Sequence, residues 1–301
     1  MVSKHIYNNI TWIDMQSPTQ EEVLHLVNEY SIPSLVAEEF MSETVRSKVD
    51  LYDNLIYLIL HFPVSRIVNP EKTEQEIDFV IGKDFLITIH YEHINSLHKF
   101  FKKFEKDNVF DKTEIATHAG YLFCHVIKEL YKCVLTELEN INQDLRKVEQ
   151  GIFGGKERET VKVISDVNRK LLDFKQSMRF HYETLKSFES AGKKFFEPEF
   201  AYYLEGIISE YNKIKNVLDN HKDLLNDLRE TNDSLLSSKT NEVMKNLTIL
   251  NFIILPIGLI AGIFAINSKL VLTIGQFYNV IGIMVLISVL IFIFLKTKKW
   301  L

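Results

Sequence analysis

Two long stretches near the C-terminus contain no charged side chain. The first lies between Lys245 and Lys269, and the second lies between Lys269 and Lys296. A helix rises about 1.5 Å per residue, so crossing the hydrocarbon core of a bilayer takes roughly 20 residues. The pattern therefore predicts two transmembrane helices, over residues 246–268 and 277–295, joined by an external loop at residues 269–276.

The positions of the lysines predict the orientation of this helical pair. Lys296, Lys298 and Lys299 follow the second stretch, whereas the connecting loop holds only Lys269. Positively charged residues stay on the cytoplasmic side of a membrane, and no apolar leader precedes the polar residues near the N-terminus. We therefore expect a multi-pass protein of the plasma or inner membrane with both termini in the cytoplasm, and with residues 296–301 as a basic cytoplasmic tail.

The first part of the chain combines strand and helix patterns. Ser17, as an N-cap before Pro18 and with Gln20 three residues later, predicts a helix that continues to about Tyr30. A second short helix is expected after Pro33. Apolar runs predict strands at residues 9–16 and 55–62, and a hairpin over residues 77–81 and 85–91 whose turn uses Gly82 for a φ that other residues avoid. Residues 1–110 are therefore expected to form a cytoplasmic α/β domain.

From about Glu114 onward the sequence predicts long helices. An apolar stripe with steps of four and three continues to Gly154-Gly155, where the first helix must end. A second helix is predicted from Glu157 to Ala191, with a turn at Gly192, so residues 111–197 form long antiparallel helices. The third helix starts near Pro198 and meets no proline until Pro256. We expect about sixty-five residues in one helix, roughly 100 Å long, in which residues 198–245 form a stalk that enters the membrane.

One face of this third helix carries acidic, polar and small side chains at alternating steps of four and three. That is the heptad spacing of helices that pack against copies of themselves. We call this set the heptad stripe. Its members are Asp223, Asp227, Glu230, Ser234, Ser237, Asn241, Met244, Thr248, Asn251, Leu255, Gly258, Gly262 and Ala265.

The chemistry of the heptad stripe favours a pore. Its part before the membrane is acidic and hydroxylic, and its membrane part holds amides, one threonine and small residues. Polar residues inside a membrane span usually face a bundle interior or a water-filled path. Gly258, Gly262 and Ala265 alone would instead favour close helix packing, and the three acids also fit a solvated helix face. The pattern by itself leaves these alternatives open.

Composition and local motifs exclude other function classes. The net charge of -5 argues against a nucleic-acid partner, for which a basic face is expected. No nucleophile, base and orienting acid can be assembled from local motifs, so we expect neither enzymatic activity nor a cofactor. His90 and His93 have a spacing that zinc can use, but no third ligand is evident nearby, and we expect solvated loop histidines.

Several motifs resemble the CorA family of divalent-cation transporters. They are Thr240 to Asn267 (TNEVMKNLTILNFIILPIGLIAGIFAIN), Lys298-Lys299-Trp300-Leu301 at the C-terminus, Trp12-Ile13-Asp14, Arg46-x-Lys48-Val49-x-x-Tyr52 and Asp78-Phe79-x-x-Gly82-Lys83. The similarity covers essentially the whole chain in the same order. It implies an α+β membrane protein that assembles as a homopentameric funnel. A cytoplasmic α/β domain would be followed by a long stalk helix that becomes the pore-lining first membrane helix, and by a peripheral second one.

The resemblance also implies roles for single residues. The family carries Gly-Met-Asn at the outer end of the first span, where this chain has Ala265-Ile266-Asn267. Mg²⁺ keeps its water shell, which a ring of Asn267 amides can bind as an outer filter. Met244 and Leu255 match hydrophobic constrictions that gate by dewetting. Asn241 matches the cytoplasmic mouth of the pore, Asp223 and Glu230 match acidic funnel positions with Asp227 on the same face, and Glu205 is the carboxylate nearest to a regulatory Mg²⁺ site between subunits.

Two departures from the family keep alternatives open. The family's acidic Met-Pro-Glu-Leu segment after the tripeptide is missing, and residues 268–276 contain Lys269 and no acid. Five Lys269 side chains at a pore mouth would repel cations, unless they extend to lipid headgroups. ZntB-like zinc transporters also keep only the asparagine of the tripeptide. We therefore expect transport of Mg²⁺, or of Co²⁺ or Ni²⁺, with a ZntB-like zinc transporter and a non-conducting pentameric scaffold or sensor as alternatives.

Overall fold

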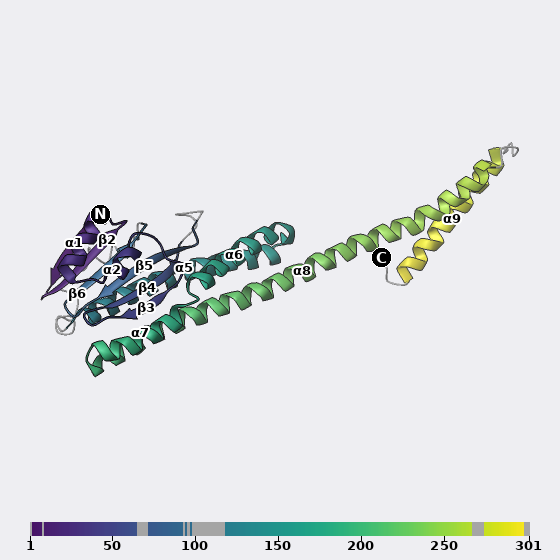
Figure 1. Ribbon diagram of the computed structural model, residues 1–301. Coiled ribbons are helices and arrows are strands. Elements are labelled where there is room, and N and C mark those ends of the chain that lie inside the picture. Colours follow the sequence, from purple (N-terminus) through teal and green to yellow (C-terminus); the bar gives the residue numbers. More distant parts are fainter. Residues whose placement is uncertain are drawn as a thin grey trace. The chain divides into compact units, whose positions relative to one another are not determined.

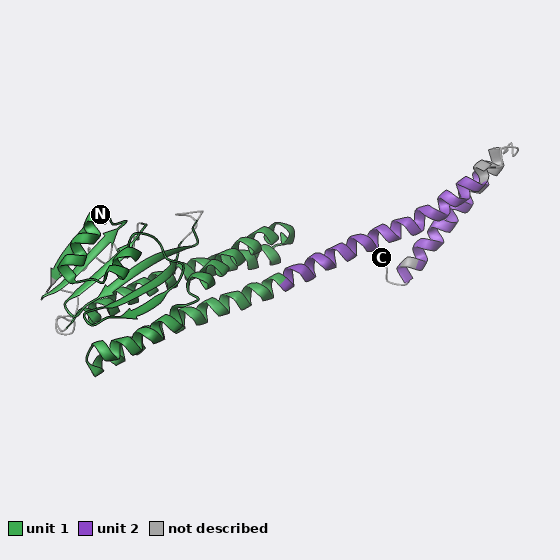
Figure 2. Ribbon diagram, viewed as in Figure 1, with its two compact units in different colours: residues 1–229 green, residues 230–301 purple. Residues whose placement is uncertain are grey.

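The computed structural model describes residues 2–7, 9–64, 72–92, 94, 97, 118–266 and 274–297. The chain divides into two compact units, residues 1–229 and residues 230–301, shown in green and purple in Figure 2. The division falls inside one long helix, α8, Ala201–Ile266. Each unit is therefore described by itself.

A six-stranded mixed sheet forms the centre of the first unit (Figure 1). Its strands lie in the order β1-β2-β6-β5-β4-β3. β2 and β6 are parallel, and all other neighbouring strands are antiparallel. The strands are β1 Val2–Tyr7, β2 Ile10–Gln16, β3 Lys48–Leu51, β4 Ile56–Pro63, β5 Glu74–Ile81 and β6 Phe85–His90.

Helices cover both faces of this sheet. On one face, α1 (Gln20–Tyr30) and α2 (Ser34–Glu39) enclose a core that includes Leu26, Tyr57 and Ile89. On the other face, Phe79 of β5 meets Phe123 of α5 (Ala119–Phe153), with ring centroids 5.2 Å apart. Strands that are buried on both faces read as continuous apolar runs, which explains the runs in β4 and β6.

The predicted α/β class is confirmed, and the predicted strands at residues 9–16, 55–62, 77–81 and 85–91 are present with small shifts at their ends. β1 and β3 were not predicted. They form the two edges of the sheet, and their sequences VSKHIY and KVDL carry charged side chains among the apolar ones. Edge strands need no continuous apolar run, because one side of them has no neighbouring strand.

The predicted start of the first helix was wrong by two residues. Thr19, not Ser17, is the N-cap, because Thr19 and Glu22 form a complete capping box. The Thr19 N–H donates to Glu22 Oε2 at 2.8 Å, and the Glu22 N–H donates to Thr19 Oγ1 at 3.3 Å. Ser17 instead donates its hydroxyl to the carbonyl of Tyr91 at 2.7 Å and ties the loop to the end of β6.

The reason given for Gly82 in the β5–β6 turn was also wrong. Gly82 is not among the described residues with a positive φ. An added Cβ would lie 2.3 Å from the Phe85 ring, so glycine is needed because that ring packs against the backbone.

The predicted helix from Glu157 to Ala191 is two helices. α6 spans Glu157–Ser177 and α7 spans His181–Phe195. The interruption contains neither proline nor glycine, so no local signal marks it. Instead, the buried side chain of His181 donates from Nε2 to the carbonyl of His61 at 2.7 Å, and its Nδ1 lies 2.9 Å from the Tyr131 hydroxyl. Tertiary contacts therefore hold the break.

Gly192 does not end the second of these helices, because α7 continues to Phe195. A Cβ on Gly192 would lie 2.7 Å from Leu204 Cδ1 near the start of α8. The glycine thus permits two helices to approach closely.

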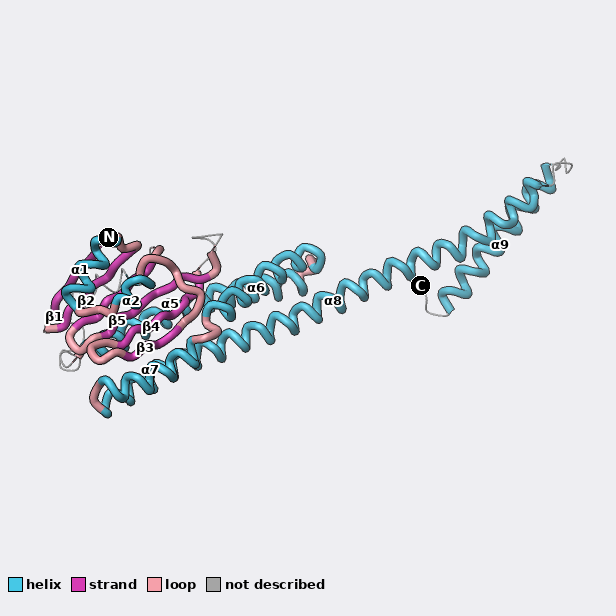
Figure 3. The backbone as a smooth tube through the Cα atoms, viewed as in Figure 1, coloured by secondary structure: helices cyan, strands magenta, loops and turns pink. Residues whose placement is uncertain are grey.

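The long third helix is confirmed. A short 3-10 turn, η1 (Pro198–Phe200), leads into α8, which has 66 residues and continues through Pro256 (Figure 3). α9, Ile274–Thr297, belongs with the last part of α8 to the second unit.

Candidate functional site

Among the described residues, α8 is the one helix that is long and apolar enough to cross a membrane. Only 6% of its apolar window is buried within the chain. Residues Ile281–Phe294 of α9 form a second apolar segment that is shorter. Apolar surface of this extent on a helix is typical of contact with lipid or with another protein.

All members of the heptad stripe from Asp223 to Gly262 are exposed. In the first unit, Asp223 and Asp227 are exposed, and in the second unit all ten members from Glu230 to Gly262 are exposed. The two bulky apolar members, Met244 and Leu255, have 55% and 69% of their surface accessible. Ala265 lies in the last turn of α8, but its side chain is outside the described residues, as is Asn267.

Some residues on other sides of α8 are buried against the chain itself. Leu225 and Leu228 are 2% and 7% accessible in the first unit, and Ile249 is 7% accessible in the second. In the second unit the heptad stripe is exposed together with bulky apolar residues on other sides of the helix, such as Leu247 and Leu259. A polar stripe on an apolar helix is costly when it faces lipid, so water or another polypeptide must cover it.

Two details show that the stripe is not built for packing within one chain. At Gly258 and Gly262 an added Cβ would meet nothing within 4 Å, so no described neighbour in this chain requires glycine there. Thr248 donates its hydroxyl to the carbonyl of Met244 at 2.8 Å. That bond satisfies its donor inside the helix and leaves the oxygen lone pairs available to accept from water.

Two acidic members of the heptad stripe, Asp223 and Glu230, have no ion-pair partner among the described residues. Both side chains are exposed. Glu205 is exposed in the second turn of α8. No group of three histidine, cysteine, aspartate or glutamate side chains within the described residues could hold a metal ion.

The prediction for His90 was wrong. His90 is only 4% accessible; its Nδ1 contacts the carbonyl of Glu92, and its Nε2 lies 3.4 Å from Asp14. It is a core histidine. Its proposed partner His93 lies outside the described residues.

Sequence reasoning also missed a cluster of buried acids in the first unit. Glu76 and Asp78 are 2% and 0% accessible on one face of β5, beside the hydroxyl of Tyr57 and the ring of His61. The available signal was the alternation of these two acids with Ile77 and Phe79, which places both carboxylates on the same side of the strand.

Comparisons with known proteins agree with this architecture. A "Cobalt/magnesium transport protein CorA" from Thermotoga maritima is 25% identical over 97% of this chain and 83% of its own length. The complete structure of the CorA magnesium transporter from Methanocaldococcus jannaschii matches with a TM-score of 0.80 at 21% identity, over 97% of this chain and 92% of that one. The cytoplasmic domain of ZntB from Vibrio parahaemolyticus matches with a TM-score of 0.61 at 11% identity, over 76% and 88%.

The family-level comparison covers almost the whole sequence. The family described as "CorA-like Mg2+ transporter protein" matches residues 7–298, which include the sheet, the long helix with its heptad stripe and the second apolar helix. The chain therefore belongs to the CorA-like Mg²⁺ transporter family.

Proposed function

We propose that this protein conducts divalent cations across the plasma or inner membrane as a homopentamer, with both termini in the cytoplasm. The observation that carries the proposal is the heptad stripe, whose described members are all exposed in the single chain while Leu225, Leu228 and Ile249 are buried. Packing five copies around the stripe would remove it from lipid and create a polar lumen. The two apolar helices would then cross the membrane, with α9 outside the ring.

The members of the stripe supply what a cation path needs. Asp223, Asp227 and Glu230 would concentrate cations at the cytoplasmic end, since rings of acids favour cation entry. Asn241, Thr248 and Asn251 offer amide and hydroxyl oxygens to a hydrated ion. Met244 and Leu255 would form two apolar constrictions at which water is excluded in a closed state. Gly258, Gly262 and Ala265 keep the outer half of the path wide, and Asn267 would form the outer filter.

The order of preference among ions follows the relatives. The relative from Thermotoga maritima is described as a cobalt/magnesium transport protein, and the matched whole-chain structure is described as a magnesium transporter. A ring of amides suits Mg²⁺ because this ion is usually bound with several of its waters retained. Mg²⁺ is therefore the first candidate, followed by Co²⁺ and Ni²⁺. Zinc is the specific alternative, because the ZntB cytoplasmic domain shares the fold and the filter keeps only the asparagine of Gly-Met-Asn.

The test is ion flux through purified protein in liposomes, measured separately for Mg²⁺, Co²⁺, Ni²⁺ and Zn²⁺. We expect Mg²⁺ flux in the wild type and flux near background in Asn267→Ala, which removes five amides but little packing. Asn246→Ala is the matched control, because Asn246 is an exposed asparagine on α8 outside the heptad stripe. Flux of Zn²⁺ alone would establish the zinc alternative.

A pentamer that carries none of the four ions would contradict the channel proposal and support a scaffold or sensor. The altered tripeptide and the basic residue Lys269 would explain such a result. Unchanged flux in Asn267→Ala would place the filter elsewhere on the stripe.

A further inference from the structure

Each of two buried carboxylates on β5 has one oxygen that accepts no hydrogen bond from a described residue. Asp78 Oδ2 accepts from the Tyr57 hydroxyl at 2.9 Å, but Asp78 Oδ1 has no partner among the described residues. Glu76 Oε2 accepts from the Thr44 N–H at 2.6 Å and from the Thr44 hydroxyl at 3.0 Å, but Glu76 Oε1 likewise has none. Leaving two buried acceptors unpaired is costly.

A single proton between the two carboxyl groups would give both of these oxygens a hydrogen-bond partner. Residues i and i+2 of a strand point to the same side, and the two carboxyl groups are near enough to interact by hydrogen bonding and charge. If Asp78 carries a proton on Oδ1, this O–H donates to Glu76 Oε1, and each orphan oxygen gains a partner. Glu76 is the better anion of the pair, since it already accepts two donors from Thr44 and lies 3.3 Å from His61 Nε2.

We propose that Asp78 and Glu76 share one proton at neutral pH, and that this proton fastens residues 42–47 to the sheet. Burial is the main cause that raises the pKa of Asp78 well above its usual range, and the negative charge of Glu76 is the second cause. Two adjacent buried carboxylates cannot both ionise without strong repulsion.

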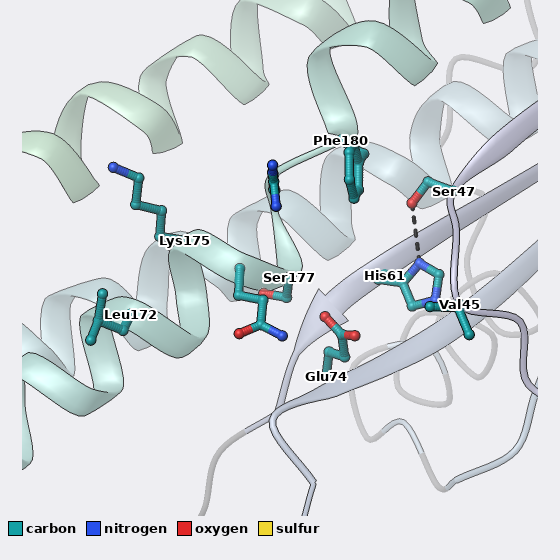
Figure 4. Close-up of a pocket in the computed structure, with 10 residues that line it drawn as sticks. Val45, Ser47, His61, Glu74, Leu172, Lys175, Ser177 and Phe180 are labelled. Atoms are coloured by element: carbon teal, nitrogen blue, oxygen red, sulfur yellow. Dashed lines mark hydrogen bonds between the residues drawn. The ribbon is translucent and has the colours of Figure 1, made fainter.

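Residues 42–47 are attached through Glu76 as well as through an ion pair of Glu43 with Lys72. Thr44 is bound through both its N–H and its hydroxyl to Glu76. Its carbonyl contacts His61 Nε2 at 3.0 Å, and the Ser47 hydroxyl lies 3.1 Å from His61 Nδ1. Figure 4 shows this Ser47–His61 bond at the rim of a cavity of about 620 Å³, with Val45 beside it. The segment is one wall of that cavity.

On the pKa of Asp78 the surrounding acids act in the same direction as burial, whereas the hydrogen bond from Tyr57 and the nearby cations oppose it. His61 would have a lowered pKa from burial alone, but its bonds to Glu76 and to the Thr44 carbonyl raise its pKa. Glu39 and Glu74 add negative charge, whereas Lys48 pairs with Glu39, and Lys175 and Arg179 line the cavity on the side of α6 and α7. Tyr57 and Tyr91 stay neutral because burial raises the pKa of each.

Rising pH should therefore release the segment. Both Asp78 and His61 have raised pKa values, so the stabilisation they provide is present at low pH and is lost as pH rises through the folded-state pKa. Loss of the Asp78 proton to solvent leaves two facing carboxylates, and loss of the His61 proton removes the cation beside Glu76.

The experiment is amide hydrogen exchange of the full chain, followed at the Thr44 N–H and corrected for the intrinsic effect of pH. In the wild type, protection should fall about tenfold or more as pH rises from neutral to the alkaline limit of folding. Asp78→Asn keeps a donor to Glu76 and cannot ionise, so Thr44 should lose much less protection at the alkaline end than in the wild type, and the remaining loss is due to His61. Asp84→Asn, in the exposed β5–β6 turn, is the matched control and should behave as the wild type.

An equal loss of protection in the wild type and in Asp78→Asn would overturn the proposal. Infrared spectroscopy of the wild type gives a second measurement that does not depend on whether any variant folds. A protonated carboxyl band should be present at neutral pH and should disappear on alkaline titration together with Thr44 protection. Absence of that band at neutral pH would overturn the shared proton directly. Neither readout depends on transport, so failure here leaves the channel proposal untouched.

Discussion

At the scale of single residues, buried ionisable side chains decide how the first unit responds to pH. His181 is completely buried, and burial lowers its pKa to about 4. It is neutral in the folded state, because its Nε2–H donates to the His61 carbonyl and its Nδ1 can accept from the Tyr131 hydroxyl. Protonating it would place an uncompensated charge in the core.

We predict that His181 destabilises the protein in acid. Its folded pKa lies below the unfolded value, so its contribution is complete above about pH 6.5 and is lost as pH falls towards about 4. The full loss corresponds to roughly 3 kcal/mol. His181→Gln should unfold more easily at neutral pH but show a shallower decline between these pH values. Denaturant unfolding at several pH values checks this.

His118 keeps part of the acid response in that variant, because burial also lowers its pKa to about 4. The slope of His181→Gln should therefore be reduced, not abolished. An unchanged slope would mean that His181 does not control the acid response.

Residue-level chemistry was only partly predictable from the sequence. The capping chemistry of the first helix was expected at Ser17 and found at Thr19, because two overlapping capping patterns compete within four residues and only Thr19 has glutamate at the reciprocal position. The pairing of Asp78 with Glu76 could not be predicted, since a carboxylate on a strand gives no sign of whether its face is solvated or covered by helices.

At the scale of elements, the junction between α7 and α8 can be tested with two glycines. A Cβ on Gly192 would lie 2.7 Å from Leu204, whereas the nearest atom to a Cβ on Gly206 is Lys128 Nζ at 4.0 Å. Gly206→Ala should stabilise the protein by up to about 1 kcal/mol, because alanine favours a helix more than glycine does. Gly192→Ala should instead destabilise it by roughly 1–2 kcal/mol through overpacking.

Thermal unfolding of both variants against the wild type measures this difference. Equal stabilisation by the two substitutions would show that Leu204 moves aside without cost. That outcome would mean that the close approach of α7 and α8 does not require glycine at position 192.

The elements differ in how well the sequence predicts them. α8 was predicted nearly to its ends, because a repeat of four and three over many turns leaves no other period. The break between α6 and α7 was missed, because it depends on the contacts of His181 with β4 and α5 and not on local sequence. Edge strands β1 and β3 were missed for a related reason, since their neighbours, not their own apolar runs, define them.

At the scale of the whole molecule, the heptad stripe predicts which positions meet across subunits. In a chain with Cys124 and Cys133 replaced by serine, Met244→Cys should give a disulfide-linked dimer of neighbouring copies, because one thiol forms one disulfide. Ile249→Cys is the matched control, because Ile249 is buried within its own chain while Met244 is 55% accessible. Crosslinking is scored on denaturing gels after mild oxidation in detergent.

Strictly monomeric behaviour of Met244→Cys would reject the assembly, and equal crosslinking at Ile249 would reject the orientation of the stripe. The number of copies is the part of the molecule that the single chain supports least directly. The alternating spacing predicts self-association, but ring size depends on the angle between neighbouring helices, which the residues of one chain do not define.

The parallel pairing of β2 with β6 has a consequence for the order of events during synthesis. β2 contacts its partner through pairs such as Trp12 with Leu86, so the first hairpin waits for about seventy further residues before it can join the sheet. At bacterial and eukaryotic elongation rates of roughly 5–20 residues per second, that wait lasts about 4–15 seconds. The sheet can then close while residues 246–268 are still unmade. The first unit thus has time to fold before the apolar part of α8 is synthesised.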